Sequence, residues 1–368
     1  MPQDIPENTD VLVIGGGNAG LCAAITAREG GAEVFLAEHA PKNMRGGNSR
    51  HTRNCRVAHD EASGFLTGPY TEEEYWQDLL RVTGGETNEQ LSRFLLNRSQ
   101  DLPAWMEDHG VTFQKALGGT LSLSHSNAFF MGGGKALVNA FYATAERLGV
   151  GTSYNTEVID LDFTDGTFTS ATLIVDGQEK KINAKAVVVA AGGFQADLDW
   201  LKEYWGPPAD NFIVRGTGFN KGKLLRVLLD AGARPVSDPT QGHCVAIDAR
   251  SPKYDGGIVT RLDCVAFGIV VDKNCDRFYD EGEDFWPKRY AIWGRLVAKQ
   301  PDQIGYSIID SKSIDLFMPS VFPPVTGDTI EELAENLEID PAALRKTVDT
   351  YNAAVKPGDF DTTVLDGC

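Results

Sequence analysis

Near its start the chain carries a glycine pattern that could bind a dinucleotide, Gly15-Gly16-Gly17-Asn18-Ala19-Gly20. The run fits G-x-G-x-x-G and stands between a predicted strand at Asp10–Ile14 and a predicted helix at Asn18–Glu29. The first glycine permits a tight turn, the second lets the backbone approach a pyrophosphate, and the third lets the helix pack on the strand. Amide groups and the positive dipole at the helix N-terminus would then hold the phosphates.

An acidic residue follows the next predicted strand, Glu33–Ala37. Glu38 stands where a carboxylate can accept hydrogen bonds from ribose hydroxyls. An acid at this position suits an unphosphorylated ribose, so these residues leave both FAD and NAD open. The alternative is a glycine-rich turn that binds nothing, and the combination of strand, glycine spacing and acid argues against it.

Composition narrows the classes of function. The 368 residues carry a formal net charge of −18 and a pI near 4.7, which argues against nucleic acid and anionic membranes as partners. No apolar run approaches the roughly 20 residues that a membrane helix needs. The six cysteines are dispersed without zinc-site spacing, so we expect reduced thiols, no metal and a cytoplasmic protein. An acidic substrate would need a local cluster of basic residues.

The helices and strands that would position the glycine motif and Glu38 can also be predicted from the sequence. Together they indicate an α/β chain of two domains. A meander of strands is predicted over residues 156–190, with turns at Asp165-Gly166 and Asp176-Gly177. Its last run, residues 186–191, is predicted to be buried on both faces. Helices are predicted over residues 70–80, 88–108, 135–148, 224–231 and 330–355. Beyond about Ser237 the sequence becomes irregular, and we place the domain boundary there.

Two further glycine segments, taken with the first, resemble the FAD-binding part of the fumarate reductase and succinate dehydrogenase flavoprotein superfamily. They are Gly46-Gly47-Asn48-Ser49 and Ala190-Ala191-Gly192-Gly193-Phe194. The resemblance favours FAD over NAD. It implies a Rossmann-like FAD-binding domain over residues 1–237 and an inserted α+β capping domain over residues 238–368. Val158 is the remaining residue among the cofactor contacts that we expect.

The mode of flavin attachment also follows from this resemblance. His51 invites comparison with the histidine that carries covalent flavin in succinate dehydrogenases. Counted from the glycine pair Gly46-Gly47, however, the matching position is Asn48. We therefore expect FAD to be bound without a covalent link.

A second stretch resembles the soluble fumarate reductase branch, and within it the tricarballylate dehydrogenases most closely. It joins the run Arg277-Phe278-Tyr279-Asp280-Glu281, which fits the family's R-F-x-x-E, to Lys288-Arg289-Tyr290-Ala291. The resemblance implies that Arg289 moves the proton at the substrate carbon. The spacing is about four residues longer than in typical fumarate reductases, which leaves Lys288 and Arg295 as alternatives to Arg289.

Two substrate-binding residues are implied in the same way. His243, in Gln241-Gly242-His243, resembles the family's histidine that bonds a substrate carboxylate, and Thr260 resembles its carboxylate-binding threonine. The family usually follows this threonine with an acid that relays protons, but here Arg261 stands at that position. The usual relay acid is therefore replaced by a basic residue at this position, and Asp263 is a candidate to take over its role.

The chemistry that these residues would perform is the removal of two hydrogens from a CH–CH bond flanked by carboxylates. It needs a hydride acceptor, a base and cations that hold the carboxylates. Arginine can serve as a base only in a desolvated site crowded with positive charge, for which Arg261, Lys288 and Arg289 are candidates. Oxidation of tricarballylate to cis-aconitate, with a separate electron-transfer partner, is the predicted activity.

Other functions stay open on the sequence. A fumarate reductase-like enzyme, a 3-ketosteroid dehydrogenase-like enzyme and an inactive flavin-binding fragment are the alternatives. The superfamily usually adds a second substrate histidine, another carboxylate-binding arginine and a G-x-x-A-A-G-E segment, which are not found in these 368 residues. We therefore expect an incomplete cap, no return to the FAD-binding domain, and poor folding and turnover by the chain as it stands.

Overall fold

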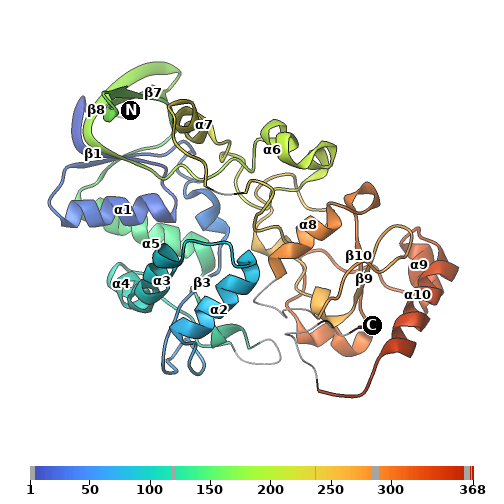
Figure 1. Cartoon of the computed structure of the whole chain (residues 1–368). Coiled ribbons are helices and arrows are strands. Elements are labelled where there is room, and N and C mark those ends of the chain that lie inside the picture. Colours follow the sequence, from blue (N-terminus) through green and yellow to red (C-terminus); the bar gives the residue numbers. More distant parts are fainter. Residues whose placement is uncertain (1–4, 118–121, 237, 283–289, 360–364, 366) are drawn as a thin grey trace. The chain divides into compact units, whose positions relative to one another are not determined.

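The computed structural model describes residues 5–117, 122–236, 238–282, 290–359, 365 and 367–368 (Figure 1). The chain divides into two compact units. Unit 1 comprises Met1–Leu117, Ser124–Leu201 and Gly216–Ser237, and unit 2 comprises Gly118–Leu123, Lys202–Arg215 and Asp238–Cys368. The assignment of a cofactor domain to residues 1–237 and a substrate cap to residues 238–368 stays a prediction.

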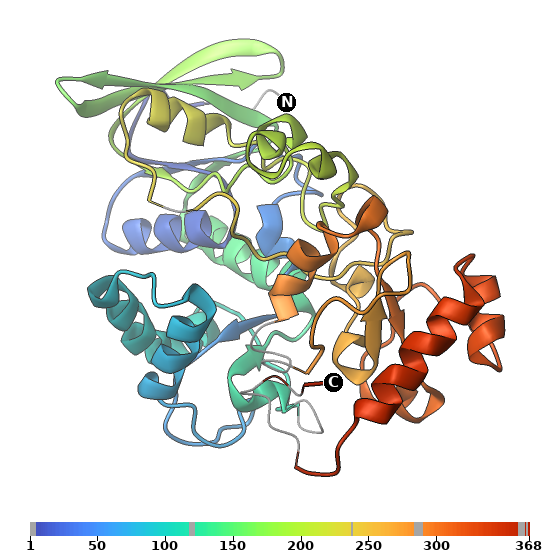
Figure 2. The same ribbon diagram turned by 45° about the vertical axis from the view of Figure 1, so that its right-hand side comes forward.

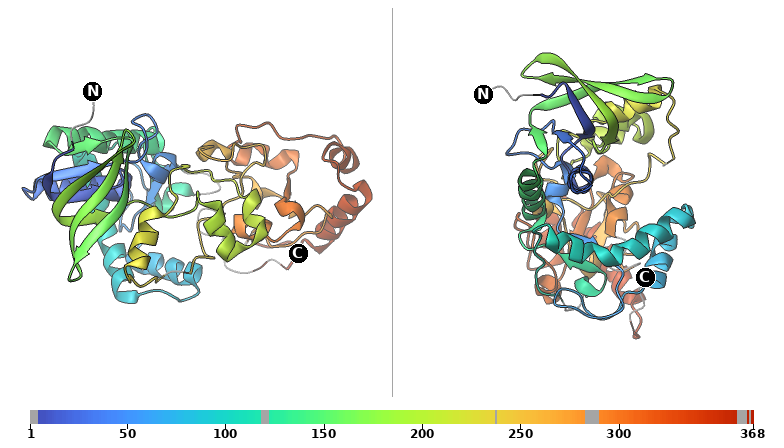
Figure 3. Two further views of the ribbon diagram at one scale, coloured as in Figure 1. Left: turned by 90° about the horizontal axis from the view of Figure 1, so that it is seen from above. Right: turned by 90° about the vertical axis from the view of Figure 1, so that its left-hand side faces the viewer.

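Unit 1 contains a six-stranded sheet, whose long strands are drawn in green in Figure 3. The sheet has the strand order β5-β2-β1-β8-β7-β6. Its strands are β1 (Asn8–Ile14), β2 (Val34–Ala37), β5 (Gly151–Ser153), β6 (Thr156–Thr164), β7 (Thr167–Val175) and β8 (Gln178–Val189). Strands β5, β2, β1 and β8 pair in parallel, whereas β6 and β7 extend the sheet in antiparallel fashion. The mixed sheet confirms the α/β class.

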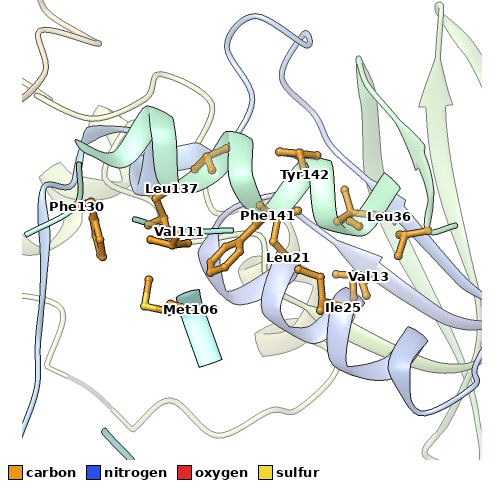
Figure 4. Close-up of a cluster of buried hydrophobic side chains, with 14 of the residues drawn as sticks. Val13, Leu21, Ile25, Leu36, Met106, Val111, Phe130, Leu137, Phe141 and Tyr142 are labelled. Atoms are coloured by element: carbon orange, nitrogen blue, oxygen red, sulfur yellow. The ribbon is translucent and has the colours of Figure 1, made fainter. Parts of the chain in front are cut away.

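Apolar side chains alternate along β1 and β2, so the sheet has a core on each face. Val13 and Leu36 point toward helices α1 (Asn18–Glu29) and α5 (Gly133–Leu148) (Figure 4). Leu12 and Phe35, its neighbour on β2, point the other way, into a second core with residues of β6, β7 and β8. The two-residue period of a strand produces this division. Helix α1 is thereby held with its first turn just beyond the end of β1.

The remaining helices and strands of unit 1 correct one predicted element. They are β3 (Asn54–Arg56), α2 (Glu72–Thr83), α3 (Glu89–Arg98), α4 (Leu102–Asp108), β4 (Asn127–Phe129) and α7 (Lys223–Asp230). The helix predicted over residues 88–108 is interrupted, because α3 ends at Arg98, a 3₁₀ turn covers Ser99–Asp101, and α4 starts at Leu102. Pro103 lies in the first turn of α4, where its missing N–H is tolerated, whereas inside a longer helix it would break a hydrogen bond.

Strand β8 also differs from its prediction. Residues 186–191 were expected to be buried on both faces, yet Val188 is 36% exposed and burial alternates along the strand. Ile182 and Ala184 point into the second core, and within the described residues the opposite face of β8 is less covered. The turns on either side of β7 agree with prediction, since Asp165-Gly166 and Asp176-Gly177 all have positive φ.

Unit 2 has a small core of its own. Figure 2 shows the helices and strands of this unit in orange and red. Its regular elements are β9 (Ile269–Val271), α8 (Trp293–Val297), β10 (Tyr306–Ile308), α9 (Ile330–Asn336) and α10 (Pro341–Ala354), and α6 (Leu198–Trp205) joins the two units. Strands β9 and β10 pair in antiparallel fashion, and α9 and α10 pack on them. The helix predicted over residues 330–355 is two helices. Asp340 caps α10 by accepting hydrogen bonds from the amides of Ala342 and Ala343.

Two general properties of the described residues complete the fold. All six cysteines have free thiols. Among the helices that the structure describes, none has both the length and the apolar character needed to cross a bilayer.

Candidate functional site

The glycine turn between β1 and α1 depends on close backbone contacts. Gly15 has φ +99°, and a Cβ there would lie 2.5 Å from the carbonyl oxygen of Ala190 at the end of β8. A Cβ on Gly20 would lie 1.8 Å from the carbonyl oxygen of Gly15. Because these clashes involve backbone atoms, they cannot be relieved by a rotamer change. The chain itself therefore requires glycine at Gly15 and Gly20.

Gly17 is different, because the described chain does not explain its lack of a side chain. Its φ is −77°, and an added Cβ would make only ordinary contacts, 3.5 Å from Ser49 Oγ and 3.6 Å from the Gly46 carbonyl oxygen. Gly17 is also the N-cap of α1 and provides no side-chain cap, while the Asn18 amide donates to Ser49 Oγ at 2.8 Å. Backbone donors at a helix N-terminus whose N-cap residue has no side chain, with space beside Gly17, fit a pyrophosphate.

Glu38 lies under this turn and holds it in place. Its carboxylate is 5% exposed and accepts hydrogen bonds from the amides of Gly16 at 3.0 Å and Ala40 at 2.8 Å. Tyr142 Oη lies 3.5 Å from the same carboxylate, and burial, followed by the charge of Glu38, raises the pKa of Tyr142 above its usual range. The amide of Gly46 also donates to Oε2 of this carboxylate, at 3.4 Å. Oε1 has a single donor, the amide of Ala40, and is therefore the oxygen that can accept a ribose hydroxyl. The bracing role was not apparent from the sequence.

The other two glycine segments converge on one asparagine that sequence reasoning missed. A Cβ on Gly192 would lie 2.7 Å from Asn220 Nδ2, and a Cβ on Gly47 would lie 3.8 Å from Asn220 Oδ1. Asn48 Oδ1 accepts a hydrogen bond from the amide of Thr217 at 2.9 Å. The segment that supplies both partners is rich in glycine, Gly216-Thr217-Gly218-Phe219-Asn220, and that composition was the available signal.

The remaining predicted cofactor residues occupy varied environments. Ala19 is exposed in the first turn of α1, and Ala191 and Gly193 are partly buried just beyond β8. The side chain of Val158 packs in the core with the strands of the sheet, so any contact with a cofactor would come from its backbone. His51 is buried at the end of a 3₁₀ turn, Gly47–His51.

Unit 2 contains a second group of candidates, held by three short backbone pairings. The amide of Asp248 donates to the carbonyl of Thr260 at 2.9 Å, and the amide of Leu262 donates to Ala246 at 3.0 Å. The amide of Cys244 donates to the carbonyl of Ala291 at 2.9 Å. The segments that carry His243, Thr260 and Tyr290 are therefore tied to one another by backbone hydrogen bonds.

Tyr290 is the centre of this group. The guanidinium carbon of Arg261 lies 4.7 Å from the centre of its ring, a cation–π contact, and the His243 ring meets it edge-on with 5.4 Å between centroids. Arg261, Asp263 and Tyr290 also line a small pocket in unit 2, together with Trp293. The sequence predicted His243 and Arg261 here, whereas Tyr290 was not among the predicted site residues.

Arg215 joins this group, although no sequence motif indicated it. Its Nη1 is buried and has no hydrogen-bond partner in the described structure. Burial, followed by the charge of Arg261, lowers the pKa of Arg215. Desolvation of the ring, followed by the charges of Arg215 and Arg261, lowers the pKa of His243 to about 4. The residue as a whole is nevertheless exposed at the surface. His243 is therefore neutral at physiological pH and can donate one hydrogen bond.

Thr260 and Asp263 are both committed to partners within unit 2. Thr260 is 3% exposed, and its hydroxyl donates to the Gly257 carbonyl at 2.9 Å, so binding a carboxylate would require the hydroxyl to turn. The Asp263 carboxylate accepts from Arg261 Nε at 2.6 Å. Asp263 is thus the counter-ion of Arg261, and a proton-relay role stays a prediction.

The R-F-x-x-E run, residues 277–281, packs beside the pocket that Tyr290 and Trp293 line. Arg277 binds Glu281 through two nitrogens, at 2.8 and 2.6 Å, and the Val270 amide donates to Glu281 at 2.6 Å. Burial raises the pKa of Glu281 despite these bonds. The rings of Phe278 and Tyr279 both meet Trp293 edge-on. The motif therefore fixes the chain next to the pocket rather than supplying a free side chain.

The proton-transfer candidates are placed unequally. Arg289 and Lys288 lie outside the described residues, so their arrangement with His243 is a prediction. Arg295, the third candidate, lies in α8 and donates to the side chain of Gln241, two residues before His243.

Comparisons with known proteins identify a family. A family model described as FAD binding domain matches residues 10–362. The chain is 25% identical over 368 residues to an NADH:fumarate oxidoreductase of Klebsiella pneumoniae (strain 342), covering 95% of this chain and 38% of the relative. It is 26% identical over 383 residues to a fumarate reductase (cytochrome) of Shewanella frigidimarina (strain NCIMB 400), covering 96% and 60%. The chain thus spans between about two fifths and three fifths of these relatives.

Solved structures share the fold. The open conformation of a flavocytochrome c3 fumarate reductase matches with a TM-score of 0.70 and 23% identity, over 98% of this chain and 64% of that one. A 3-ketosteroid-Δ4-(5α)-dehydrogenase from Rhodococcus jostii RHA1 matches with a TM-score of 0.71 and 21% identity, over 96% and 79%. At these identities the likeness shows the fold alone.

The two kinds of glycine in the turn predict different effects of substitution. Gly17→Ala should remove FAD and leave thermal stability close to that of the FAD-free wild type, because the added Cβ meets the pyrophosphate rather than the protein. Gly20→Ala should lower stability, because its Cβ meets the Gly15 backbone. Thermal denaturation and the flavin absorbance of the purified proteins measure both effects.

Gly64→Ala is the control, since no atom of the described chain lies within 4 Å of the added Cβ. Full flavin content in the Gly17 variant would show that the cofactor site is misassigned. Acid precipitation of the wild type should release intact FAD, and flavin retained on the denatured chain would contradict non-covalent binding.

The pKa of His243 predicts a pH effect on stability. Its folded pKa of about 4 lies below the ordinary value of 6.5, so between these pH values the unfolded state binds a proton that the folded state does not. The free energy of unfolding should therefore fall as the pH is lowered through this window, and fall less in His243→Gln. Urea unfolding at pH 7 and pH 5 measures the difference. An NMR titration midpoint near 6.5 for the wild-type ring would contradict the assignment.

Proposed function

Because the chain belongs to the FAD binding domain family, we propose that it is a flavin-dependent oxidoreductase that oxidises the CH–CH bond of a small polycarboxylate, tricarballylate to cis-aconitate. The observation that carries the proposal is the positive group around Tyr290, made by Arg215 and Arg261, in a chain with a net charge of −18. Such a group attracts an anion locally against the field of the whole protein.

The residues of unit 2 divide the work of holding the substrate. His243 is neutral at physiological pH, so it can donate a hydrogen bond to a carboxylate without competing for the substrate's proton. Thr260 offers a second bond if its hydroxyl turns from Gly257. Arg289 is the proposed group that takes the proton, and positive neighbours favour its neutral form. FAD, when bound, supplies the hydride acceptor.

The cofactor residues support this proposal from unit 1. Gly17, Asn18 and Ser49 offer a pyrophosphate site, and Glu38 lies beneath the turn that forms it. Their geometry supports FAD binding, which the family model also indicates. We further propose that the electrons leave through a separate redox partner, and that the flavin is not covalently attached.

Two alternative functions have specific support. The two relatives described above are named for fumarate reduction, which is the reverse type of reaction on a dicarboxylate. A steroid substrate would suit a tyrosine-centred acid/base site, and Tyr290 is a tyrosine at the centre of the group in unit 2. The two neighbouring arginines favour a carboxylate over a neutral steroid, because a buried guanidinium without an anion is costly.

Flavin reduction distinguishes these substrates. Tricarballylate added anaerobically to the FAD-loaded protein should bleach the flavin absorbance and form cis-aconitate. Fumarate should reoxidise the reduced flavin slowly or not at all, and a 3-ketosteroid with a saturated A ring should leave the oxidised flavin unchanged. Bleaching by the steroid alone would favour the alternative. No response to any of the three would support the inactive flavin-binding fragment.

Substitutions distinguish the roles of the candidates. Arg289→Ala should abolish carboxylate oxidation while FAD content is preserved, because the proton acceptor is lost. His243→Ala should be milder, since one hydrogen bond to a charged group is typically about 1.5–3 kcal/mol, roughly ten- to a hundredfold in rate. Single-turnover flavin reduction measures both. Lys312→Ala is the control, because that side chain is 88% exposed on unit 2.

Full activity in the Arg289 variant would move the proton-transfer role to Lys288 or Arg295. Equal losses in the Arg289 and His243 variants would show that the two residues do not have the different roles assigned to them.

A further inference from the structure

Arg215 occupies a firmly held position at the end of a segment of unit 2, Lys202–Arg215. The amide of Val214 donates to the carbonyl of Lys253 at 2.8 Å, and the amide of Gly257 donates to the carbonyl of Arg215 at 3.1 Å. These bonds fix the backbone on both sides of the Cα. The side chain nevertheless ends in a buried Nη1 that no hydrogen-bond partner meets in the described structure.

The electrostatic surroundings of Arg215 are unfavourable without a ligand. Arg261 contributes a second guanidinium, only 3% exposed at its side chain, and its counter-ion is Asp263. Burial and then Arg261 lower the pKa of Arg215. Glu281, another acid beside Arg261 in the pocket, is bonded to Arg277 and the backbone of Val270. In the described part of unit 2, the two positive charges of Arg215 and Arg261 are thus balanced by one nearby carboxylate, that of Asp263, which is already paired with Arg261.

An anion would remove this imbalance. A carboxylate is planar and accepts paired hydrogen bonds from guanidinium nitrogens, so it could satisfy Arg215 Nη1 and offset the repulsion between the two arginines. Buried like charges and an unmet donor are costly, and costs of this kind are retained mainly at functional sites. A purely structural arginine would instead have its polar atoms bonded within the protein.

We propose that Arg215 and Arg261 bind a carboxylate of the substrate beyond the two on the reacting carbons, and so select tricarboxylates over dicarboxylates. The inference rests on the proposed function. The two carboxylates of the CH–CH unit are assigned to His243 and Thr260, whereas a third carboxylate, one CH₂ away, needs its own donors. Arg215 is then a specificity-determining residue, and Arg261 replaces a proton-relay acid with a substrate anchor.

A matched pair of ligands tests this selectivity without flavin chemistry. cis-Aconitate and maleate differ by one CH₂COO⁻ group, and neither reduces oxidised FAD. Calorimetry on the FAD-loaded protein should show that Arg215→Met weakens cis-aconitate binding roughly ten- to a hundredfold, the range for one lost hydrogen bond to a charged group. Maleate binding should change less than about threefold. Lys312→Met is the control and should bind both ligands like the wild type.

Stability gives a second readout that a structural role would not share. Arg215→Met removes an unmet buried donor and a like-charge repulsion while keeping the length of the side chain. The ligand-free variant should therefore melt at a higher temperature than the wild type. A lower melting temperature together with unchanged cis-aconitate binding would show that Arg215 is structural.

The His243 ring reports on the same site. cis-Aconitate should raise the NMR titration midpoint of His243 from about 4, because the bound anion offsets the charges of Arg215 and Arg261. Equal loss of cis-aconitate and maleate binding in Arg215→Met, or no loss of either, would overturn the inference even if tricarballylate bleaches the flavin. Arg215-dependent binding without bleaching by tricarballylate would retain the anion site and reject the proposed dehydrogenation.

Discussion

The close approach of α1 to β1, with Gly20 packed against the carbonyl of Gly15, is the contact on which the rest of unit 1 depends. It brings the first turn of the helix to the end of the strand, where the amides of Gly17 and Asn18 stand beside the segment 46–49. Glu38 then ties the turn to the loop after β2. A single larger residue at position 20 would separate these parts, since backbone atoms oppose the added Cβ.

The two units differ in the groups that supply positive electrostatic potential at their candidate sites. In unit 1, backbone amides and a helix dipole supply positive potential without any charged side chain, which suits a cofactor that is always needed. In unit 2, guanidinium groups supply it at the cost of burial and mutual repulsion. If Arg215 and Arg261 bind an anion as proposed, unit 2 gains stability when that anion arrives.

Much of unit 1 could be predicted because its signals are local. The bounds of α1 and the turns at Asp165-Gly166 and Asp176-Gly177 follow from glycine placement and side-chain periodicity. The break between α3 and α4 was missed although Pro103 marked it. The pattern of burial on β8 was missed because an apolar run does not show which of its faces other elements cover.

The candidate site of unit 2 was predicted only in part, for a physical reason. His243, Thr260 and Arg261 belong to recognisable runs, but what they do depends on partners distant in sequence. Arg215 lies in a loop without periodicity, and its importance comes from a missing hydrogen-bond partner and a nearby charge, which no spacing encodes. Hydrogen-bond satisfaction is a property of the folded chain.

The pairing of β1 with β8 also has a consequence for the order of assembly. Strands β6, β7 and β8 are joined by two-residue turns and can meet early, whereas β1 must find a strand about 175 residues away, as in the pair Asn8–Asn183. The turn at Gly15 lies against Ala190, at the far end of that late pairing. A partly folded intermediate that holds only the hairpins has no nucleotide site, so flavin capture marks the completion of the sheet.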